Sequence, residues 1–482
     1  MEKNSIKKNV VLSIAYNILN IIFPLITFPY VSRVLMVEGL GNVTFFSTMA
    51  NYAIMLSALG INTYGVRAVS RVRDNKKQLS KVTVELLIIN AVASVTVVLL
   101  LLISSLYVTK FSSEPILLAI NCALIFTSPF GLNFLFYGLE QYRYITKLSI
   151  LVKTIALILV FLLVKTNDDY CVYAAITAFS TIGAYIFNLL YARKFITFTE
   201  LKNLEYSPHF NSMMFFFASS LAVSVYISLD TIMLGFISGD EQVGLYAVAV
   251  KIKTLLLIVV NAISAVLFPR LSYYIATNRL DDFRNVLIKS FSTILMISIP
   301  LTIFFIIESR DSVLFLGGQD YLEASSCMKI IMPILILSGI SNITGNQILL
   351  PIGKEKCFMK AVIAGAFIDL ILNILLMPTW GCVGAAIATL LAECTQLSIQ
   401  LYYSQAYVIH AIKWKIILHI IISTVCSSLF LVYIQIKVHY SGLLNILFGS
   451  ICFFMCYGFI LVIMKDDLIL DYLKEFHKLR KR

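Results

Sequence analysis

The stretch FPLITFPYVSRVLMVEGLG at residues 23–41, followed by GINTYGVRAVSRVR at residues 60–73, decides the fold of this chain. It leads from one long apolar segment through a short polar turn into a second apolar segment. Pro24 and Pro29 stand in the middle of the first segment, and Arg33 follows four residues after the second proline. A proline removes a helical hydrogen bond, and in lipid such a break survives only where neighbouring helices or water repair it. The stretch therefore predicts a bent helix that faces protein or water.

The composition is that of an integral membrane protein. Of the 482 residues, 59% are hydrophobic and 13% are charged, whereas soluble domains run at roughly 45–50% apolar and 25% charged. The net charge of +12 does not indicate nucleic-acid binding, because the charges lie between apolar runs and not on one basic domain. The chain is therefore predicted to lie in a membrane and to have no nucleic-acid partner.

Apolar segments long enough to cross a bilayer recur along the whole chain. A transmembrane helix needs about 20 mostly apolar residues, and fourteen segments meet this requirement. They lie at about residues 9–34, 41–66, 82–107, 115–138, 146–164, 170–192, 212–236, 243–268, 286–308, 327–350, 358–378, 381–404, 414–436 and 442–464. The sequence thus predicts an all-α polytopic membrane protein of about 14 transmembrane helices.

Lysine and arginine predict the orientation of these helices. The two termini and the even-numbered loops carry 29 of these cations, whereas the odd-numbered loops and their helix ends carry 5. Cytoplasmic loops are the ones enriched in Lys and Arg. Both termini are therefore predicted to face the cytoplasm, and the protein is predicted to be a multi-pass membrane protein.

Two longer linkers divide the fourteen segments into groups of six, six and two. The predicted domains are an N-lobe of six spans at residues 1–205 and a C-lobe of six spans at residues 206–405. Two further spans and a basic cytoplasmic tail occupy residues 406–482.

The two predicted lobes contain a repeated unit. With an offset of 203 residues, Gly41 aligns with Gly244 and Arg67 aligns with Arg270, without a gap between them. Both units start on the same side of the membrane, so the repeat is parallel. Parallel repeats are a standard plan of transporters, with the substrate site between the two halves.

Charged residues inside apolar segments are candidates for a functional site, because burying a charge at the bilayer centre costs roughly 2.5–3.5 kcal/mol. The cations are Arg33 and Lys251, and the acids are Asp230, Asp369 and Glu393. Asp230 and Lys251 could also form a purely structural ion pair, and Glu393 could close a polar contact between helices. Glu85 and Lys153 carry weaker signals of the same kind.

Signals for covalent or metal chemistry are missing from the sequence. The nine cysteines form no CxxC pair, and the five histidines show no metal-ligand spacing. The short loops leave no room for a catalytic domain. We therefore predict a protein that is not an enzyme, with no catalytic residues, no metal site and no cofactor, while coupling to H+ or Na+ stays open.

Four motifs in order resemble a known family. They are SRVLMVEGLGNVTF with ALGINTYGVRAVSR, then GLYAVAVKIKTL through VLFPRLSYY, then QILLPIGKEK, and last ILNILLMPTWGCVGAAIATLLAE. Together they resemble bacterial oligosaccharide (O-unit or repeat-unit) flippases, which are polysaccharide biosynthesis and export proteins of the multidrug/oligosaccharidyl-lipid/polysaccharide exporter (MATE-like) superfamily. The likeness covers about residues 5–405.

The resemblance implies a fold and an activity. The family fold is two six-helix lobes in a V that opens alternately to either side, with two extra C-terminal helices in relatives that move lipid carriers. The implied activity is flipping of an undecaprenyl-diphosphate-linked oligosaccharide repeat unit, made for O-antigen or capsule, from the cytoplasmic to the outer leaflet. The implied location is the bacterial cytoplasmic (inner) membrane. The implied partners are this substrate, membrane lipid, and polymerase and chain-length proteins of the same pathway.

The resemblance also assigns residues. Arg33 matches a family arginine, Lys251 matches a basic residue of the later motif, and Gln347 matches a polar position before LLPIGK. Arg33 and Lys251 would then bind the diphosphate. The sugar would be contacted by Tyr30, Asn51, Tyr64 and Gln347, and charge balance or ion coupling would fall to Asp230, Asp369 and Glu393. This chain departs from the family at Met36-Val37, where Gly-Pro is common, and at Asp369, where an amide is common.

Three other functions stay open at this point. One is a cation-coupled multidrug antiporter of the same superfamily, which twelve spans and an acidic cavity would favour. Another is a polysaccharide polymerase or ligase, which would need a larger outer loop than residues 309–326, the longest here. The third is a passive scaffold, which would need neither buried charges nor a repeat.

Overall fold

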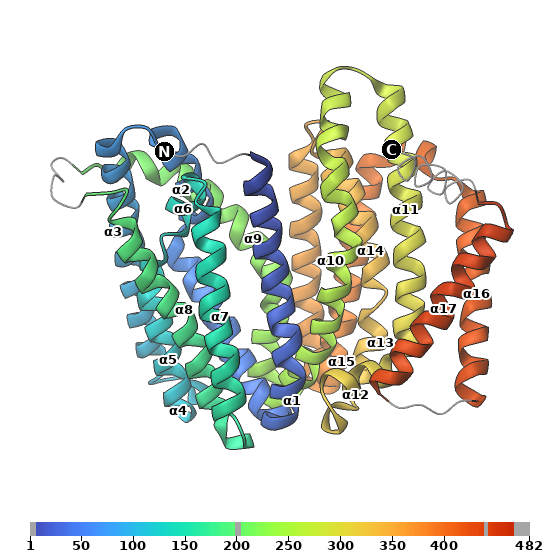
Figure 1. The fold of residues 1–482 in the computed structure, drawn as a ribbon, viewed down its shortest axis with the longest axis horizontal. Helices are drawn as coiled ribbons and strands as arrows, with labels where there is room; N and C mark the ends of the chain where they lie inside the picture. The colour runs from blue at the N-terminus through green and yellow to red at the C-terminus, as the bar shows by residue number, and fades with distance from the viewer. Residues whose placement is uncertain (1–5, 198–203, 438–441, 467–482) are drawn as a thin grey trace. The chain divides into compact units, whose positions relative to one another are not determined.

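The computed structural model describes residues 6–197, 204–437 and 442–466, and these residues fold as helices joined by short turns, with no strand among them (Figure 1). The α-helices are α1 (Ile6–Ala58), α2 (Ile61–Val72), α3 (Lys76–Ser104), α4 (Thr109–Ser113), α5 (Pro115–Thr127), α6 (Asn133–Gly138), α7 (Tyr142–Leu163), α8 (Tyr170–Ala192), α9 (Ser207–Ile237), α10 (Asp240–Ala276), α11 (Leu280–Ile307), α12 (Ser309–Leu316), α13 (Ala324–Ile331), α14 (Ile334–Asn342), α15 (Glu355–Ala411), α16 (Trp414–Lys437) and α17 (Leu443–Ile463). Short 3-10 or π turns are η1 (Ser128–Gly131), η2 (Asn167–Asp169), η3 (Gln319–Tyr321) and η4 (Ile343–Leu349). The prediction of an all-α polytopic protein is confirmed.

Within the described residues, 11 helical segments are long and apolar enough to cross a membrane. Two of them, in α1 and α15, are each interrupted by a kink and contain two of the predicted spans. The seventh predicted span corresponds to α9, which is 31 residues long. These features account for the difference between the 11 segments and the fourteen predicted from apolar runs.

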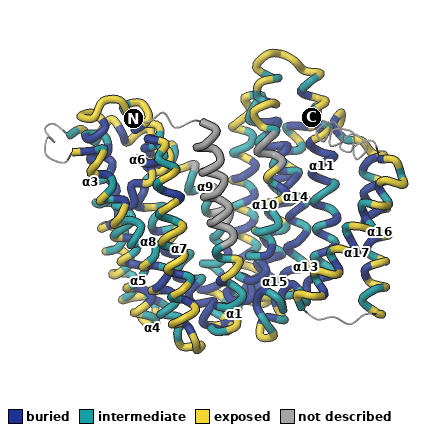
Figure 2. The backbone as a smooth tube through the Cα atoms, viewed as in Figure 1, coloured by how far each residue is buried: buried dark blue, intermediate teal, exposed yellow. Residues whose placement is uncertain are grey.

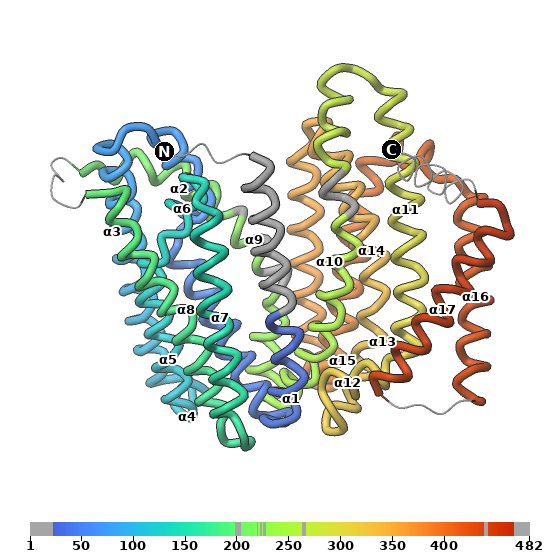
Figure 3. The backbone as a smooth tube through the Cα atoms, in the orientation of Figure 1, coloured from blue at the N-terminus to red at the C-terminus, as the bar shows by residue number. Residues whose placement is uncertain are grey.

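The kinks in α1 and α15 are tight reversals of the chain, which Figure 3 shows as turns within one continuous tube. Met36 in α1 has φ 55 and ψ −171, and Gly381 in α15 has φ 49 and ψ −128. Glycine adopts a positive φ at little cost, whereas methionine is uncommon there. The turn predicted at residues 36–41 is therefore sharper than expected and centres on one residue.

The predicted repeat is visible in the backbone. Gly239, which lies 203 residues after Met36, also has a positive φ, of 90. A Cβ built on Gly41 would lie 1.8 Å from the Asp240 carbonyl oxygen, and one built on Gly244 would lie 2.1 Å from the Val37 carbonyl oxygen. Because Asp240 is the repeat equivalent of Val37, these two contacts are reciprocal, as a two-fold relation requires. The structure thus confirms that the two copies of the repeated turn correspond.

The chain divides into two compact units, residues 1–244 and 245–482. Each unit has its own apolar cluster: one is built around Phe134 and Phe136, and the other around Phe283 and Phe291. Figure 2 shows buried residues on the inner helix faces of each unit and exposed ones along outer faces such as those of α3 and α16. The three predicted domains, with boundaries at residues 205 and 405, stay a prediction.

Two segment boundaries differ from the sequence-based expectation. The second predicted span, residues 41–66, ends at Ala58, because Leu59 and Gly60 take positive φ values of 46 and 80 and a separate helix, α2, begins at Ile61. The outer loop predicted at residues 309–326 is largely helical, as α12, η3 and the start of α13.

Candidate functional site

Arg33, which is predicted to bind the diphosphate, lies on α1 just before the kink at Met36. Its side chain is exposed, and Nη1 donates a 2.5 Å hydrogen bond to the carbonyl oxygen of Pro29, one turn earlier. On the same helix, Tyr30 donates a 2.7 Å hydrogen bond to the Val164 carbonyl, and its ring lies 4.7 Å from that of Phe161. The Tyr30 hydroxyl thus links α1 to the end of α7, while the Arg33 side chain stays accessible.

Asn51 lies on α1 beyond the kink and lines a pocket of about 120 Å³. The other lining residues are polar as well: Thr48, Tyr52, Ser224 and Ser228. Tyr52 donates a 2.5 Å hydrogen bond to the Ser224 carbonyl of α9. Asn51 itself is exposed, so its amide is available to a ligand that enters between α1 and α9.

Tyr64 belongs to a polar network that fixes the start of α9. Its hydroxyl lies 2.7 Å from His209 Nδ1, and His209 Nε2 lies 2.9 Å from Glu85 Oε2. Glu85 also accepts a 2.7 Å hydrogen bond from the Glu205 backbone N–H. Burial raises the pKa of Tyr64, with the neighbouring Arg71 acting in the opposite direction. Tyr64 therefore stays protonated and joins α2, α3 and α9.

This network changes the interpretation of two residues. Glu85, a weak candidate from the sequence, is 2% exposed and holds the linker that leads into α9. His209 carried no metal spacing and received no role from the sequence. Their pairing has no sequence signal, because 124 residues separate them.

The predicted residues of the second unit lie on α10, η4 and α15. Lys251 on α10 is half-buried, whereas Asp369 and Glu393 are 2% and 7% exposed. A Cβ on Gly365 would lie 3.2 Å from the Ala392 carbonyl oxygen. Gly365 is one turn before Asp369, so the two halves of α15 pack closely at this level and bring both acids into one helix pair.

The remaining predicted acid, Asp230, lies on α9 in the first unit and is 2% exposed. Its predicted role in charge balance or ion coupling stays a prediction, as do those of Asp369 and Glu393. Within the described residues, no group of three or more His, Cys, Asp or Glu side chains is placed to hold a metal ion.

Gln347 lies in the π-helical segment η4 and is fully buried. Its Oε1 accepts a 2.7 Å hydrogen bond from Ser290 on α11. Around η4, buried amides and hydroxyls form a chain in which Gln396 donates to Ser341, and both Ser341 and Thr344 donate to Gln400. π-helical segments are rare and occur frequently at functional sites. The amide-rich run SNITGNQ at residues 341–347 is the sequence signal for this network, of which only Gln347 was predicted.

Lys110, one of the five cations of the odd-numbered loops and their helix ends, holds the turn between α9 and α10. Its Nζ donates 2.6 Å hydrogen bonds to the Gly235 carbonyl and to Asp240 Oδ1, and it lies 4.4 Å from the centroid of the Phe45 ring. Both side chains of the ion pair are largely buried, at 15% and 21% exposed. The second of the two repeat turns is therefore fixed by a charge from α4.

A second acidic group that the sequence did not indicate lies at the end of α11. Glu308 is 1% exposed and accepts hydrogen bonds from Gln435 on α16 (2.5 Å) and Asn445 on α17 (3.2 Å). Asn445 also donates to Asp311. Burial, and secondarily the Asp311 charge, raises the pKa of Glu308 to about 7, with the Gln435 hydrogen bond acting in the opposite direction.

We expect the raised pKa of Glu308 to make stability pH-dependent. Because the folded-state pKa is raised, the stabilisation is fully present below about pH 4.5 and is lost as the pH rises through about 7. At 1.36 kcal/mol per pKa unit, the contribution of Glu308 to the free energy of unfolding is about 3 kcal/mol larger at low pH than above the folded-state pKa. Thermal unfolding of Glu308→Gln between pH 5 and 8 should therefore vary less with pH than that of the wild type. The matched control is Glu323→Gln, at an exposed acid; the same flattening there, or none in Glu308→Gln, would refute this reading.

The fold built from these kinked helices is shared with a known class of membrane transporters. The structure is similar to that of "Lipid II flippase MurJ, inward closed conformation", with a TM-score of 0.78 at 16% identity over 95% of this chain and all of that one. It is also similar to an inward-facing MATE multidrug transporter of the MOP superfamily, with a TM-score of 0.61 at 14% identity over 82% and 94% of the two chains. The fold is that of this transporter superfamily.

Sequence comparison gives the family. The polysaccharide biosynthesis protein family matches residues 6–275, and the chain belongs to it; the MatE family matches residues 216–375. A protein of Escherichia coli (strain K12) named "Putative O-antigen transporter" is 27% identical over 404 residues, which cover 83% of this chain and 97% of that protein. The predicted family is thus confirmed. The names of these relatives are those of transporters and flippases, in agreement with the prediction of a protein that is not an enzyme.

Proposed function

We propose that this protein is a flippase for a lipid-linked oligosaccharide. The proposed substrate is an undecaprenyl-diphosphate-linked repeat unit, which moves from the cytoplasmic to the outer leaflet of the inner membrane during surface polysaccharide synthesis. The observation that carries this proposal is the family match together with a relative that is named for O-antigen transport and is covered over 97% of its length. The fold, shared with a lipid II flippase, supports it.

In this proposal, Arg33 and Lys251 bind the diphosphate. Arginine can form two parallel hydrogen bonds to phosphate, whereas lysine acts as a point charge. The exposed side chain of Arg33, three residues before the kink of α1 at Met36, supports its role.

Among the proposed sugar-binding residues, the surroundings of Asn51 give the strongest support, because it is exposed in a polar pocket. The hydroxyls of Tyr30 and Tyr64 are bonded to Val164 and His209, so these residues would offer ring surfaces rather than hydroxyls. Gln347 is fully buried beside Ser290. It would act on the sugar only through a rearrangement of η4.

During alternating access, the two repeat turns would separate and come back into contact. The close approach of Gly41 to Asp240 and of Gly244 to Val37 supports a state in which the turns predicted to face outward are in contact. Coupling to H+ or Na+ would use Asp230, Asp369 or Glu393. The two termini would be cytoplasmic, and polymerase and chain-length proteins of the same pathway would take up the product.

A second candidate, a cation-coupled drug antiporter, is favoured by the MatE match at residues 216–375. Gene deletion in the native host separates the two. We expect loss of surface polysaccharide with accumulation of lipid-linked repeat unit, and unchanged susceptibility to cationic drugs. Intact polysaccharide combined with increased drug susceptibility would contradict the flippase and support the antiporter.

A further inference from the structure

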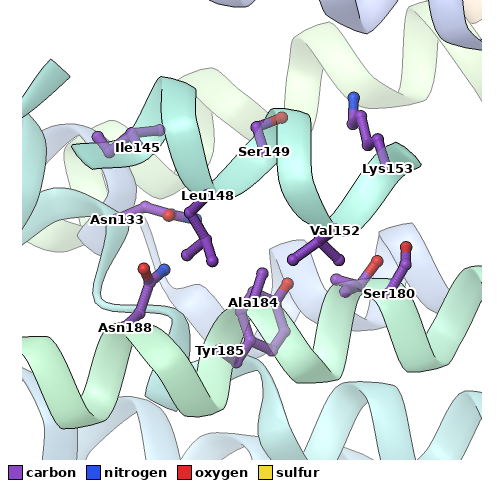
Figure 4. Close-up of a pocket in the computed structure, with 11 residues that line it drawn as sticks. Asn133, Ile145, Leu148, Ser149, Val152, Lys153, Ser180, Ala184, Tyr185 and Asn188 are labelled. Carbon is purple, nitrogen blue, oxygen red and sulfur yellow. The ribbon is translucent and has the colours of Figure 1, made fainter. Parts of the chain in front are cut away.

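A pocket of about 240 Å³ lies between α7 and α8 in the first unit, with one wall from α6 (Figure 4). Seven of its eleven lining residues are polar: Asn133, Ser149, Lys153, Ser180, Thr181, Tyr185 and Asn188. Binding sites for drug-sized ligands measure roughly 300–1,000 Å³. This pocket therefore suits a smaller polar group, about the size of one sugar ring.

One end of the pocket presents hydrogen-bond acceptors. Asn188 is 6% exposed; its Nδ2 donates a 2.7 Å hydrogen bond to the Gly131 carbonyl, which turns Oδ1 away from that bond. Among the described residues, Asn188 Oδ1 has no hydrogen-bond partner, and leaving a buried acceptor unpaired costs about 1–3 kcal/mol. Ser180, which lies near Lys153 at the other end of the pocket (Figure 4), and Thr181 next to it in the sequence donate their hydroxyl protons to the Thr177 carbonyl, so their oxygens can accept as well. A ligand at the Asn188 end can pair this buried oxygen by donating a hydrogen bond.

Lys153 lies at the opposite end of the pocket from Asn188 (Figure 4). It is half-buried and lies about 16 Å along α7 from Tyr142, at 1.5 Å per residue. That depth is near the middle of a hydrocarbon core about 30 Å thick. Charged residues at this depth usually face protein or water and mark substrate or ion pathways. At the Lys153 end, a negatively charged group on the ligand would strengthen binding.

Gly131 in η1 contacts two lining residues of the pocket, Tyr185 and Asn188. A Cβ at this position would lie 2.8 Å from Tyr185 Cε1, so only glycine lets the Tyr185 ring lie against η1. The same residue holds Asn188 through its carbonyl. The Tyr185 ring and the Asn188 amide are thus fixed side by side. This arrangement suits a ligand that is a hydroxylated ring.

We propose that the pocket between α7 and α8 binds one sugar residue with a negatively charged substituent, its hydroxyls donating to Asn188 and its anionic group facing Lys153. This inference rests on the proposed function, because it places that sugar in the carried oligosaccharide. It narrows the substrate class to repeat units that contain a uronic acid or another acidic sugar. A pocket that holds only water is the alternative that the experiment must exclude.

The test is binding of free sugars to the purified full-length protein in nanodiscs. Saturation-transfer NMR compares glucuronate with glucose at millimolar concentrations, and thermal unfolding checks that each variant is folded. We expect glucuronate to bind about tenfold more tightly, as one charge-assisted contact provides. Lys153→Met should abolish this preference, and Lys153→Arg should keep it. The matched control is Lys147→Met, which removes an exposed charge from the same helix.

A second pair of variants tests the location without changing charge. Ala184→Leu fills the pocket and should reduce binding of both sugars, whereas Ala175→Leu adds the same volume to an exposed position of α8 and should not. Equal binding of the two sugars to the wild type, no binding of either, or equal effects of Lys153→Met and Lys147→Met would overturn the inference. If the protein flips lipid-linked oligosaccharide but shows any of these results, this inference alone fails and the proposed function stands.

Discussion

Replacing Gly41 with alanine is expected to abolish surface polysaccharide while the protein remains in the membrane. The added Cβ would lie 1.8 Å from the Asp240 carbonyl oxygen, and because this atom belongs to the backbone, no side chain can move aside. Such overpacking costs roughly 1–3 kcal/mol. The cost falls on the state in which the two repeat turns touch, so its population relative to the open state should fall about 5- to 150-fold. The measurement is surface polysaccharide in a deletion strain that expresses the variant.

Two further glycines make this experiment specific. Gly39→Ala is the matched control, because its Cβ would lie 3.4 Å or more from its neighbours, at ordinary contact distance. Gly244→Ala should behave like Gly41→Ala, because its Cβ would meet the Val37 carbonyl oxygen at 2.1 Å. Full activity of both Gly41→Ala and Gly244→Ala would contradict a role for this contact. Equal loss in Gly39→Ala would show a general sensitivity of the turn instead.

Removing either side chain that is proposed to bind the diphosphate should also stop transport. For Arg33→Ala and Lys251→Ala, we expect loss of surface polysaccharide at normal protein levels. A charge-assisted hydrogen bond contributes about 1.5–3 kcal/mol, equivalent to a rate about 10- to 100-fold lower if the bond forms in the rate-limiting step. Arg33→Lys should retain partial activity, because the charge stays but the paired hydrogen bonds are lost.

Neighbouring cations provide the controls for these variants. Lys253 is two residues from Lys251, so the two side chains point to nearly opposite faces of α10, and Lys253→Ala should leave transport unchanged. Arg73 pairs with the exposed Glu140 at 3.3 Å, and such surface pairs contribute about 0–1 kcal/mol; Arg73→Ala should likewise be neutral. Full complementation by both Arg33→Ala and Lys251→Ala would remove the cationic site from the mechanism.

The fold was predictable because its signals are local and periodic. Apolar runs of about 20 residues indicate the membrane-spanning segments directly, and the match of Gly41 to Gly244 indicates the repeat. The helix boundary at Gly60 was not predicted, because apolar residues flank it directly at Leu59 and Ile61. The helix α12 was read as a loop, because its eight residues are too few to give a clear helical period.

The site was predictable only in part. Charges within apolar runs pointed to Asp369 and Glu393, and the structure buries both in one helix pair. The pairs Glu85–His209 and Glu308–Gln435 could not be predicted, because each joins residues more than 100 positions apart. Their sequence positions show a charge but not its partner. The same limit applied to Lys153, whose value as a candidate depends on the pocket around it.

The central claim, movement of a lipid-linked oligosaccharide across a bilayer, is tested most directly with the purified protein in liposomes. Undecaprenyl-diphosphate-linked repeat unit, labelled on the sugar, is placed in both leaflets, and a glycosidase added outside reports how much label reaches the outer leaflet over time. Wild-type protein should make nearly all the label accessible, while protein-free vesicles should level off near half. Gly41→Ala vesicles should approach the wild-type level about 5- to 150-fold more slowly. A wild-type curve that levels off near half, with folded protein in the membrane, would contradict the account.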